Sequence, residues 1–198
     1  GIFTDTQSKW LTKVEYGAPR WQISFAVAAE NCKDTDVTGA DDSCKAWQGY
    51  YATAKGDDAG EGNATSYSMR AYWKPEDVGL MPALQVGYDI RNIDDADNTA
   101  GAVEATASWM IGAIWDDAFV DGNRAGLAFG QRAYATEVHN SSESVDDDAD
   151  DNFVWEAYYD YKVSDSITVT PALFGGSNTE TGTDDDIFGA LVQTTFKF

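Results

Sequence analysis

The residues that decide the fold are the last eleven, Phe188-Gly-Ala-Leu-Val-Gln-Thr-Thr-Phe-Lys-Phe198. Phe188, Ala190, Val192, Thr194, Phe196 and Phe198 alternate there with Gly189, Leu191, Gln193, Thr195 and Lys197. Alternation with a period of two is the pattern of a β-strand that has two different faces. Aromatic residues end the first set, as expected at the interface of a bilayer. The stretch therefore predicts a strand with one face against lipid.

The same alternation recurs in eight further segments. They are residues 10–16, 21–27, 67–73, 84–90, 105–115, 125–129, 153–161 and 167–173. In each segment one face is apolar and the other is polar or small, and Trp and Tyr lie at the ends of the apolar face as a whole. Helical periodicity is absent throughout. The pattern predicts an all-β protein, an antiparallel transmembrane β-barrel whose aromatic face contacts lipid and whose polar face encloses water.

The connections between these segments are of two kinds. Short ones cover residues 17–20, 74–82, 116–123 and 164–165, and long acidic ones cover residues 30–63, 92–102, 137–152 and 175–186. The two kinds alternate strictly along the chain. Outer-membrane barrels have short periplasmic turns and long external loops. We therefore expect residues 1–198 to be one barrel portion with every long connection outside.

One segment does not fit this count. Lys45 to Thr53 also alternates like a strand, although it lies inside the long connection 30–63. We expect it to fold back within that external loop; if it spans the membrane instead, the strands number ten. Cys32 and Cys44 lie in the same connection without the spacing of a metal motif. A disulfide that braces the loop in an oxidising compartment is therefore predicted over free thiols.

The number of strands decides how the barrel closes. Nine antiparallel strands leave the first and the last running in the same direction, and bacterial barrels have even strand numbers. Unpaired strand edges cannot face lipid, because each unsatisfied backbone group costs several kcal/mol there. We therefore expect this chain, which begins at Gly1 without a signal peptide, to be the C-terminal part of a larger barrel. The number of missing strands is then odd. If Lys45 to Thr53 also spans the membrane, this chain has ten strands and can close into a barrel alone.

Composition excludes two other classes of protein. The formal net charge is −21, and the chain contains 7 Trp, 10 Tyr and 9 Phe. Nucleic-acid binding needs a basic face and is excluded. Acidity with few aromatic residues would predict disorder, whereas this aromatic content predicts a folded chain.

Charged residues on the polar faces are the candidate lining of the lumen. They are Lys13, Glu15, Arg70, Asp89, Arg91, Glu104, Arg124, Arg132, Glu156, Asp160 and Lys162. Acids and bases are nearly balanced among them, which suggests facing acidic and basic rows across a constriction. Most of the negative charge lies in the long connections, and such a vestibule should favour cations modestly and lose that preference as salt rises.

No resident cofactor or metal is predicted. The stretch that begins at Asp34 starts like a calcium-binding loop, but its twelfth position is Lys45 instead of Glu. The acidic runs 146–151 and 184–186 are expected to be solvated loop charge. The alternative for them is loose Ca²⁺ or Mg²⁺ that bridges the loops to lipopolysaccharide phosphate.

Five stretches carry a resemblance to a known family. They are Tyr-Trp-Lys-Pro at 72–75, Trp-Asp-Asp-Ala-Phe-Val-Asp-Gly-Asn at 115–123, Gly-Leu-Ala-Phe-Gly-Gln at 126–131, Tyr161 to Phe174, and the terminal Val-Gln-Thr-Thr-Phe-Lys-Phe. Together they resemble the C-terminal half of cyanobacterial outer-membrane porins, often named iron-uptake porins. The similarity is most specific from Tyr67 onward. The cysteine pair and the strongly acidic loops depart from the family pattern.

The resemblance implies a channel in the cell outer membrane for passive diffusion of small hydrophilic solutes and ions, with inorganic iron as suggested cargo. It implies contact with outer-membrane lipid and lipopolysaccharide, and a homo-oligomer, most often a trimer. Family members also carry an N-terminal S-layer-homology domain that holds peptidoglycan. That part is not in this sequence.

Two other function classes compete with a channel. In an enzyme, His139 would be the base, but nothing in its acidic surroundings near Asn140, Ser141 and Ser142 fixes it, so no enzyme is predicted. In a soluble, secreted acidic β-sandwich for adhesion or carbohydrate binding, the aromatic residues would be sugar platforms. Detergent dependence and heat-modifiable gel migration separate a barrel from that sandwich.

Overall fold

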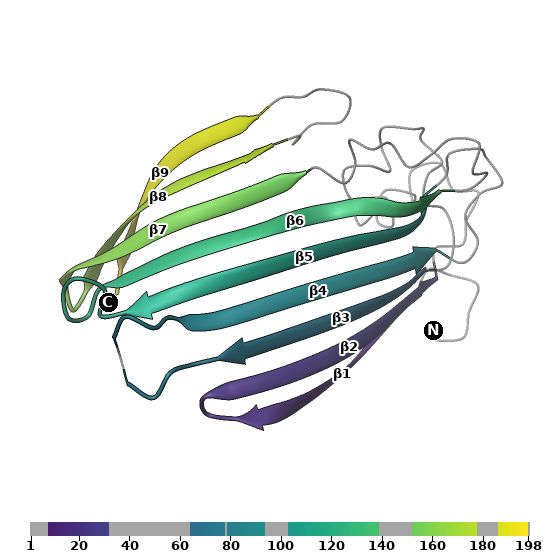
Figure 1. The fold of residues 1–198 in the computed structure, drawn as a ribbon, viewed down its shortest axis with the longest axis horizontal. Helices are drawn as coiled ribbons and strands as arrows, with labels where there is room; N and C mark the ends of the chain where they lie inside the picture. Colours follow the sequence, from purple (N-terminus) through teal and green to yellow (C-terminus); the bar gives the residue numbers. More distant parts are fainter. Residues whose placement is uncertain are drawn as a thin grey trace.

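The computed structural model describes residues 8–31, 64–77, 79–93, 103–138, 152–177 and 186–197. They form nine strands: β1 (Ser8–Ala18), β2 (Trp21–Asn31), β3 (Ala64–Trp73), β4 (Ala83–Ile93), β5 (Val103–Asp116), β6 (Arg124–Val138), β7 (Phe153–Ser164), β8 (Ile167–Ser177) and β9 (Ile187–Phe196). The strands lie in one sheet in the order of the sequence, and every neighbouring pair is antiparallel. Figure 1 shows this single meander. All nine predicted strands are confirmed.

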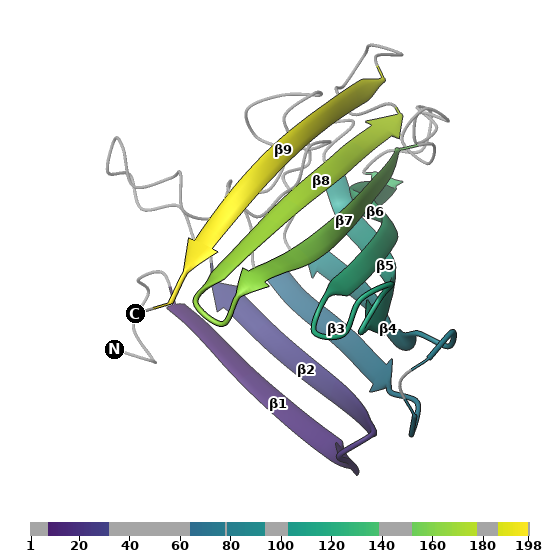
Figure 2. The same cartoon turned by 90° about the vertical axis from the view of Figure 1, so that its left-hand side faces the viewer.

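The sheet is curved rather than flat. Figure 2 shows it curling into an open trough, in which β7 to β9 arch above the level of β1 and β2. The strands β1 and β9 are the two edges, because the order of the sheet does not return from β9 to β1. The short turns join the strands at one end of the trough, and the segments that connect β2 to β3, β4 to β5, β6 to β7 and β8 to β9 leave from the other end (Figure 1).

Register divides the side chains into two faces. Residues opposite each other on neighbouring strands point to the same side of the sheet. One such row runs through Phe25, Met69, Tyr88 and Trp109, and the adjacent row runs through Ser24, Arg70, Gly87 and Met110. The first row belongs to a face that is apolar across all nine strands, which we call the apolar face. The second belongs to the polar face, and the predicted division is confirmed.

Among the described residues, large apolar side chains other than Ile93 are not buried. The buried apolar residues among those described are small ones, apart from Ile93: Ala28, Ala64, Ala105, Ala107 and Ala172. In contrast, Trp10 is 50% exposed, Phe188 71% and Tyr16 75%. A soluble sandwich would bury such side chains between two sheets, but the described residues make a single layer. The fold is therefore that of a transmembrane β-barrel wall, and the sandwich alternative is not favoured.

Several strands extend further than the alternation indicated. The strand β2 continues to Asn31, and Glu30 pairs with Ala64 of β3. Glu30 therefore belongs to the sheet, not to the external loop 30–63 in which it was expected. The pairing of β2 with β3 is direct along ten residue pairs, so no strand lies between them. Lys45 to Thr53, Cys32 and Cys44 themselves lie outside the described residues.

Strand β6 is irregular at the end away from the short turns. The register between β5 and β6 shifts between Val103 and Ala105, between Ala105 and Thr106, and between Ala107 and Trp109. Extra residues on one strand of a pair bend it and increase its twist. Across the described residues, no helix is long and apolar enough to span a bilayer.

Candidate functional site

The polar face is the candidate functional surface, and strand register places nine of the eleven predicted lining residues on it, whereas Glu104 and Arg132 stand where the register between β5 and β6 shifts. Strand register places Lys13 and Glu15 on the same face as Ser24, and this face continues through Arg70, Asp89 and the even-numbered residues of β5, β7 and β8 and of β6 as far as Gly130. Large side chains of this face lie over the glycines opposite them, as expected on the concave side of a curved sheet. We therefore place it on the inside of the trough.

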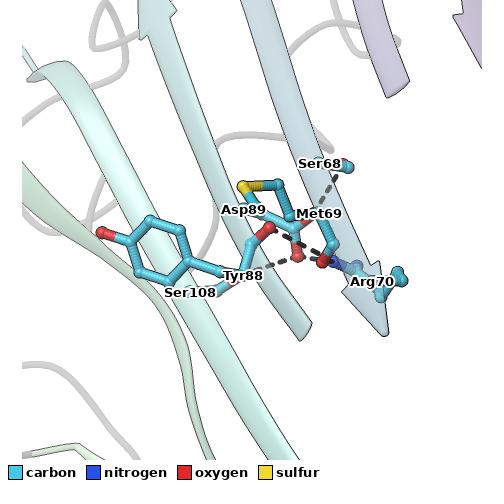
Figure 3. A network of polar contacts seen from close by, with 6 residues as sticks. All are labelled: Ser68, Met69, Arg70, Tyr88, Asp89 and Ser108. Atoms are coloured by element: carbon cyan, nitrogen blue, oxygen red, sulfur yellow. Dashed lines mark hydrogen bonds and ion pairs between the residues drawn. The ribbon is translucent and has the colours of Figure 1, made fainter. Parts of the chain in front are cut away.

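A network of polar contacts spans β3, β4 and β5 at the middle of this face. Figure 3 shows Asp89 at its centre. Its carboxylate accepts hydrogen bonds from the hydroxyls of Ser68 at 2.6 Å and Ser108 at 3.2 Å, and from Nη2 of Arg70 at 2.8 Å. Arg70 also donates from Nη1 to the carbonyl of Met69 at 2.9 Å. Arg70 therefore lies along the wall instead of extending away from it.

A hollow lies beside this network. Its volume is about 300 Å³, and its lining residues come from β1 to β5. Lys13 and Glu15 form an ion pair on β1 at one side of the hollow. Gln22, Ser24 and Gln85 contribute neutral hydrogen-bonding groups. The hollow thus combines two internally compensated ion pairs with amide and hydroxyl groups, which suits water and small polar solutes.

A second group of charges lies at the short-turn end of the polar face. Asp116 contacts Lys74 Nζ at 3.2 Å and Arg124 Nε at 3.0 Å. On the neighbouring strands, Asp160 accepts a hydrogen bond from the Thr170 hydroxyl at 2.7 Å. Asp116 and Lys74 were not among the predicted lining residues, because both stand at strand ends that the sequence assigned to turns. The sequence did offer one signal: Asp116 and Lys74 carry charges opposite to each other, and Asp116 and Arg124 flank the same short turn.

Acidic and basic residues are interleaved on this face. Arg70 contacts Asp89, Lys13 contacts Glu15, and Arg124 contacts Asp116. The expectation of separate acidic and basic rows was therefore wrong for this part of the wall. Cross-strand neighbours of opposite charge stabilise a sheet, whereas like charges directly opposite destabilise it. Such pairing leaves little net charge on the described wall.

Arg91 differs from the other predicted lining residues because it is buried. Its side chain is 8% exposed, and Nη1 lies 2.7 Å from Oε2 of Glu30, whose side chain is 7% exposed. The pair lies at the end of the sheet from which the long segments leave. Sequence reasoning missed Glu30, since a charged residue after an alternating segment looks like the start of a loop. Arg91 holds the wall together and does not line its open surface.

The remaining predicted lining residues lie near the two ends of the polar face. Glu104 and Arg132 are on β5 and β6 near the end with the long segments, and the Arg132 amide donates to Oδ1 of Asn152 at 3.0 Å. Glu156 is exposed opposite Ala128. Lys162 contacts Asp165 at 3.0 Å in the turn between β7 and β8.

The apolar face carries aromatic side chains at two levels. Near the short turns, Tyr16 and Trp21 make an edge-to-face contact with ring centroids 5.6 Å apart, and Trp21 stands opposite Trp73. Nearer the other end, Phe129 stacks on Phe153 at 5.8 Å. Trp and Tyr favour the two interfaces of a bilayer. The two levels therefore mark an apolar band of the kind that outer-membrane barrels present to lipid.

The turn between β5 and β6 is held by one buried side chain. Asn123 is 3% exposed, donates to the Tyr159 hydroxyl at 2.8 Å and accepts from the Lys162 amide at 2.9 Å. The turn also places Phe119 at a φ of 62°, a left-handed conformation that is unusual for a bulky residue. The Asn123 bonds to β7 compensate for this local backbone cost.

Replacement of Asn123 by Ala should therefore destabilise the protein. We expect a loss of about 1–3 kcal/mol, because groups of β7 and the turn would be left without their buried partners. Unfolding by urea in lipid vesicles, followed by tryptophan fluorescence, measures it. Asp121→Ala in the same turn is the matched control, because Asp121 is exposed and should change the stability by less than about 0.5 kcal/mol. Equal stability of the two variants would contradict the role of Asn123.

Comparison with known proteins agrees with this geometry. Residues 114–198, from the end of β5 through β9, match the sequence model of a family described as carbohydrate-selective porin, OprB family. The chain is also similar to the uncharacterized protein alr4550 of Nostoc sp. (strain PCC 7120), with 29% identity over 138 residues. That region is 69% of this chain but 22% of the relative, so the chain spans about a fifth of the relative's length. No solved structure matches the chain.

The family match and the fold point to the same class of protein. Porins of this family are outer-membrane channels, and they are not a family of enzymes. The part of the chain before residue 114 lies outside the family match, although its strands continue the same sheet without a break. The resemblance to porins is therefore supported, whereas an iron cargo and an S-layer-homology domain remain predictions.

Proposed function

We propose that this chain forms part of the wall of an outer-membrane channel for passive diffusion of small hydrophilic solutes and ions. The observation that carries the proposal is the division of the sheet into an apolar face with exposed aromatic side chains and a polar face lined by compensated charges. A face of exposed Trp, Tyr and Phe is stable against hydrocarbon, and a face of paired charges and amides is stable against water. The porin match of residues 114–198 supports the same conclusion.

Closure of the channel requires more strands than the nine described. The strands β1 and β9 run in the same direction, since an even number of antiparallel steps separates them. Pairing them directly, or pairing them with the edges of a second copy in the same orientation, would be parallel. Open edges in lipid leave backbone groups unsatisfied. We therefore propose that an odd number of further antiparallel strands lies between β9 and β1.

A modest preference for cations follows from where the acidic residues lie in the sequence. Nineteen of the 34 acidic residues, but only three of the 13 basic residues, fall in the segments 32–63, 94–102, 139–151 and 178–185. All four segments join strand ends at the same end of the sheet. Negative charge at a channel entrance concentrates cations there, and salt screens the effect. The described wall itself contributes little to selectivity, because its charges are paired.

The proposal extends to the transported solutes, the oligomeric state and the partners of the channel. The name of the matched family makes neutral sugars the first solutes to test, and inorganic iron is a second cargo, suggested by the resemblance to iron-uptake porins. We propose a homo-oligomer, with a trimer as the expected state, in contact with outer-membrane lipid and lipopolysaccharide. Divalent cations at the acidic segments would bridge them to lipopolysaccharide phosphate. Contact with peptidoglycan would require an additional domain.

Planar lipid bilayers test the channel and its selectivity separately. The full-length protein should give stepwise currents, and under a KCl gradient the reversal potential should have the sign of K⁺ preference. Replacing Asp146, Asp147, Asp148, Asp150 and Asp151 by Asn should shift that potential toward zero without abolishing the currents. A potential that favours chloride would contradict the cation preference alone. A protein that inserts but carries no current would contradict the channel.

A further inference from the structure

Four large side chains of the polar face lie directly over glycines of the neighbouring strand. Arg70 of β3 stands opposite Gly87 of β4, and Gln85 of β4 stands opposite Gly112 of β5. The same arrangement recurs where Tyr158 of β7 stands opposite Gly126 of β6, and where Phe174 of β8 stands opposite Gly189 of β9. The pattern therefore recurs across the curved sheet, on strands far apart in the sequence.

The space above each glycine is occupied by the opposing side chain. A Cβ atom built on Gly112, Gly126 or Gly189 would lie within 3.0 Å of atoms of Gln85, Tyr158 or Phe174. At Gly87 the Cδ of Arg70 would be 3.0 Å away. A Cβ atom essentially never lies within 3.0 Å of another non-bonded heavy atom, so any larger residue would force the opposing side chain to move. The sheet backbone lies below, so the open direction of movement is away from the wall.

Arg70 shows what this arrangement achieves. Its guanidinium group donates to the carbonyls of Met69 at 2.9 Å and Tyr88 at 3.3 Å, both in the backbone of the wall, and to the carboxylate of Asp89 at 2.8 Å (Figure 3). These bonds require the side chain to cross β4 close to its backbone, over Gly87. The hollow of about 300 Å³ lined by Arg70 and Gln85 is open because both side chains lie to the side.

We propose that Gly87, Gly112, Gly126 and Gly189 are positioning residues that hold large side chains against the wall and so set how much of the lumen is open. This inference rests on the proposed channel function and extends it, because it assigns the width of the passage to residues that touch no solute. Tyr158 is the side chain with the largest expected consequence. It carries a bulky ring, and it lies near the short-turn mouth, two positions along β7 from Asp160.

Gly126→Ala is the deciding variant. The added methyl group should push the Tyr158 ring away from the wall, and single-channel conductance should fall, by up to roughly twofold, because the passage narrows near one mouth. Removing the Tyr158 ring should restore the conductance. The double variant Gly126→Ala with Tyr158→Ala should therefore conduct at least as well as the wild-type protein. Chemical denaturation in lipid of these three proteins and of the single variant Tyr158→Ala should show coupling, with Gly126→Ala destabilising only when Tyr158 is present.

One control and a second test separate positioning from a general loss of structure. Gly79 lies in the turn between β3 and β4, where an added Cβ would meet nothing within 4 Å, so Gly79→Ala should leave conductance and stability unchanged. Gly112→Ala is a milder second test, since Gln85 is flexible, and Gln85→Ala should reverse its effect on conductance. The Gly112→Ala and Gln85→Ala variants also test the inference if Gly126→Ala fails to fold.

The outcomes distinguish this inference from the function on which it rests. A fall in conductance that is reversed by removing the overlying side chain would support it. Wild-type currents that neither Gly126→Ala nor Gly112→Ala reduces would overturn the positioning role and leave the channel intact. A reduction that persists in the double variants would also overturn it, because the glycines would then act through the backbone. Absence of wild-type current would overturn the proposed channel, and the positioning role with it.

Discussion

Replacing Glu30 by Ala is expected to lower the free energy of unfolding by about 3–5 kcal/mol, because it would leave Arg91 as an uncompensated buried charge. The two side chains are at most 8% exposed, and the contact joins β2 to β4 across β3. Little water reaches Arg91, so solvent cannot replace the lost carboxylate. Denaturation of the protein in lipid vesicles, followed by tryptophan fluorescence and by the loss of heat-modifiable gel migration, measures the change.

The ion pair of Lys13 and Glu15 provides the matched control. Both side chains are nearly half exposed, and an exposed pair contributes about 0–1 kcal/mol. Glu15→Ala should therefore change stability several-fold less than Glu30→Ala. The double variant Glu30→Leu with Arg91→Met should recover much of the loss, since apolar residues often replace a buried pair without cost. A small effect of Glu30→Ala, equal to that of Glu15→Ala, would mean that water reaches Arg91 and that it belongs to the open lining.

The strands and their two faces were predictable because a single physical pattern specifies both. A face that must meet hydrocarbon is apolar at every second residue, and a shift of one residue would turn every such side chain to water. Short turns then fix which strands pair. This is why the row from Phe25 to Trp109 and the polar row beside it were both correctly anticipated from alternation alone.

The ends of the strands were less predictable from the sequence. The part of the candidate site that lies at those ends was therefore missed. Glu30 and Asp116 are charged residues that close alternating segments, and charge at such positions usually indicates a loop. Each belongs to a strand because a partner across the sheet neutralises it: Arg91 in one case, Lys74 and Arg124 in the other. Such partners come from other strands, so they become visible only once the register is known.

Which charges contact one another was also outside the reach of the sequence. Balanced composition permits either separate rows or neighbouring pairs. The choice depends on register and on space, as Arg70 shows: it reaches Asp89 because Gly87 leaves room for its side chain to cross the strand. A wall built in this way stays nearly neutral, so in the proposed channel selectivity by charge would come from the acidic segments at one end, and selectivity by size from the wall.

The apolar face leads to the second large effect. Ile111→Arg is expected to destabilise the protein by about 2–4 kcal/mol, which is the cost of a charged residue on the lipid face near the middle of a bilayer. Ile111 lies between Trp109 and Trp115 on β5 and is 48% exposed, with apolar neighbours opposite it on β4 and β6. Its exposure in this sheet is therefore exposure to hydrocarbon, where an arginine has no water to solvate it.

Ala128→Arg is the control at nearly the same level of the sheet but on the polar face. It stands opposite the exposed Glu156 of β7, so the new guanidinium would meet water and a carboxylate, and stability should change little. Unfolding and refolding of both variants in vesicles, with gel migration before and after boiling, compares them directly. A reversed order, with Ile111→Arg tolerated and Ala128→Arg severe, would exchange the wet and the lipid-facing sides of the sheet. The lumen, its compensated charges and the glycines beneath its large side chains would then have to be sought on the opposite face, where the side chains are Trp, Tyr, Phe and Val.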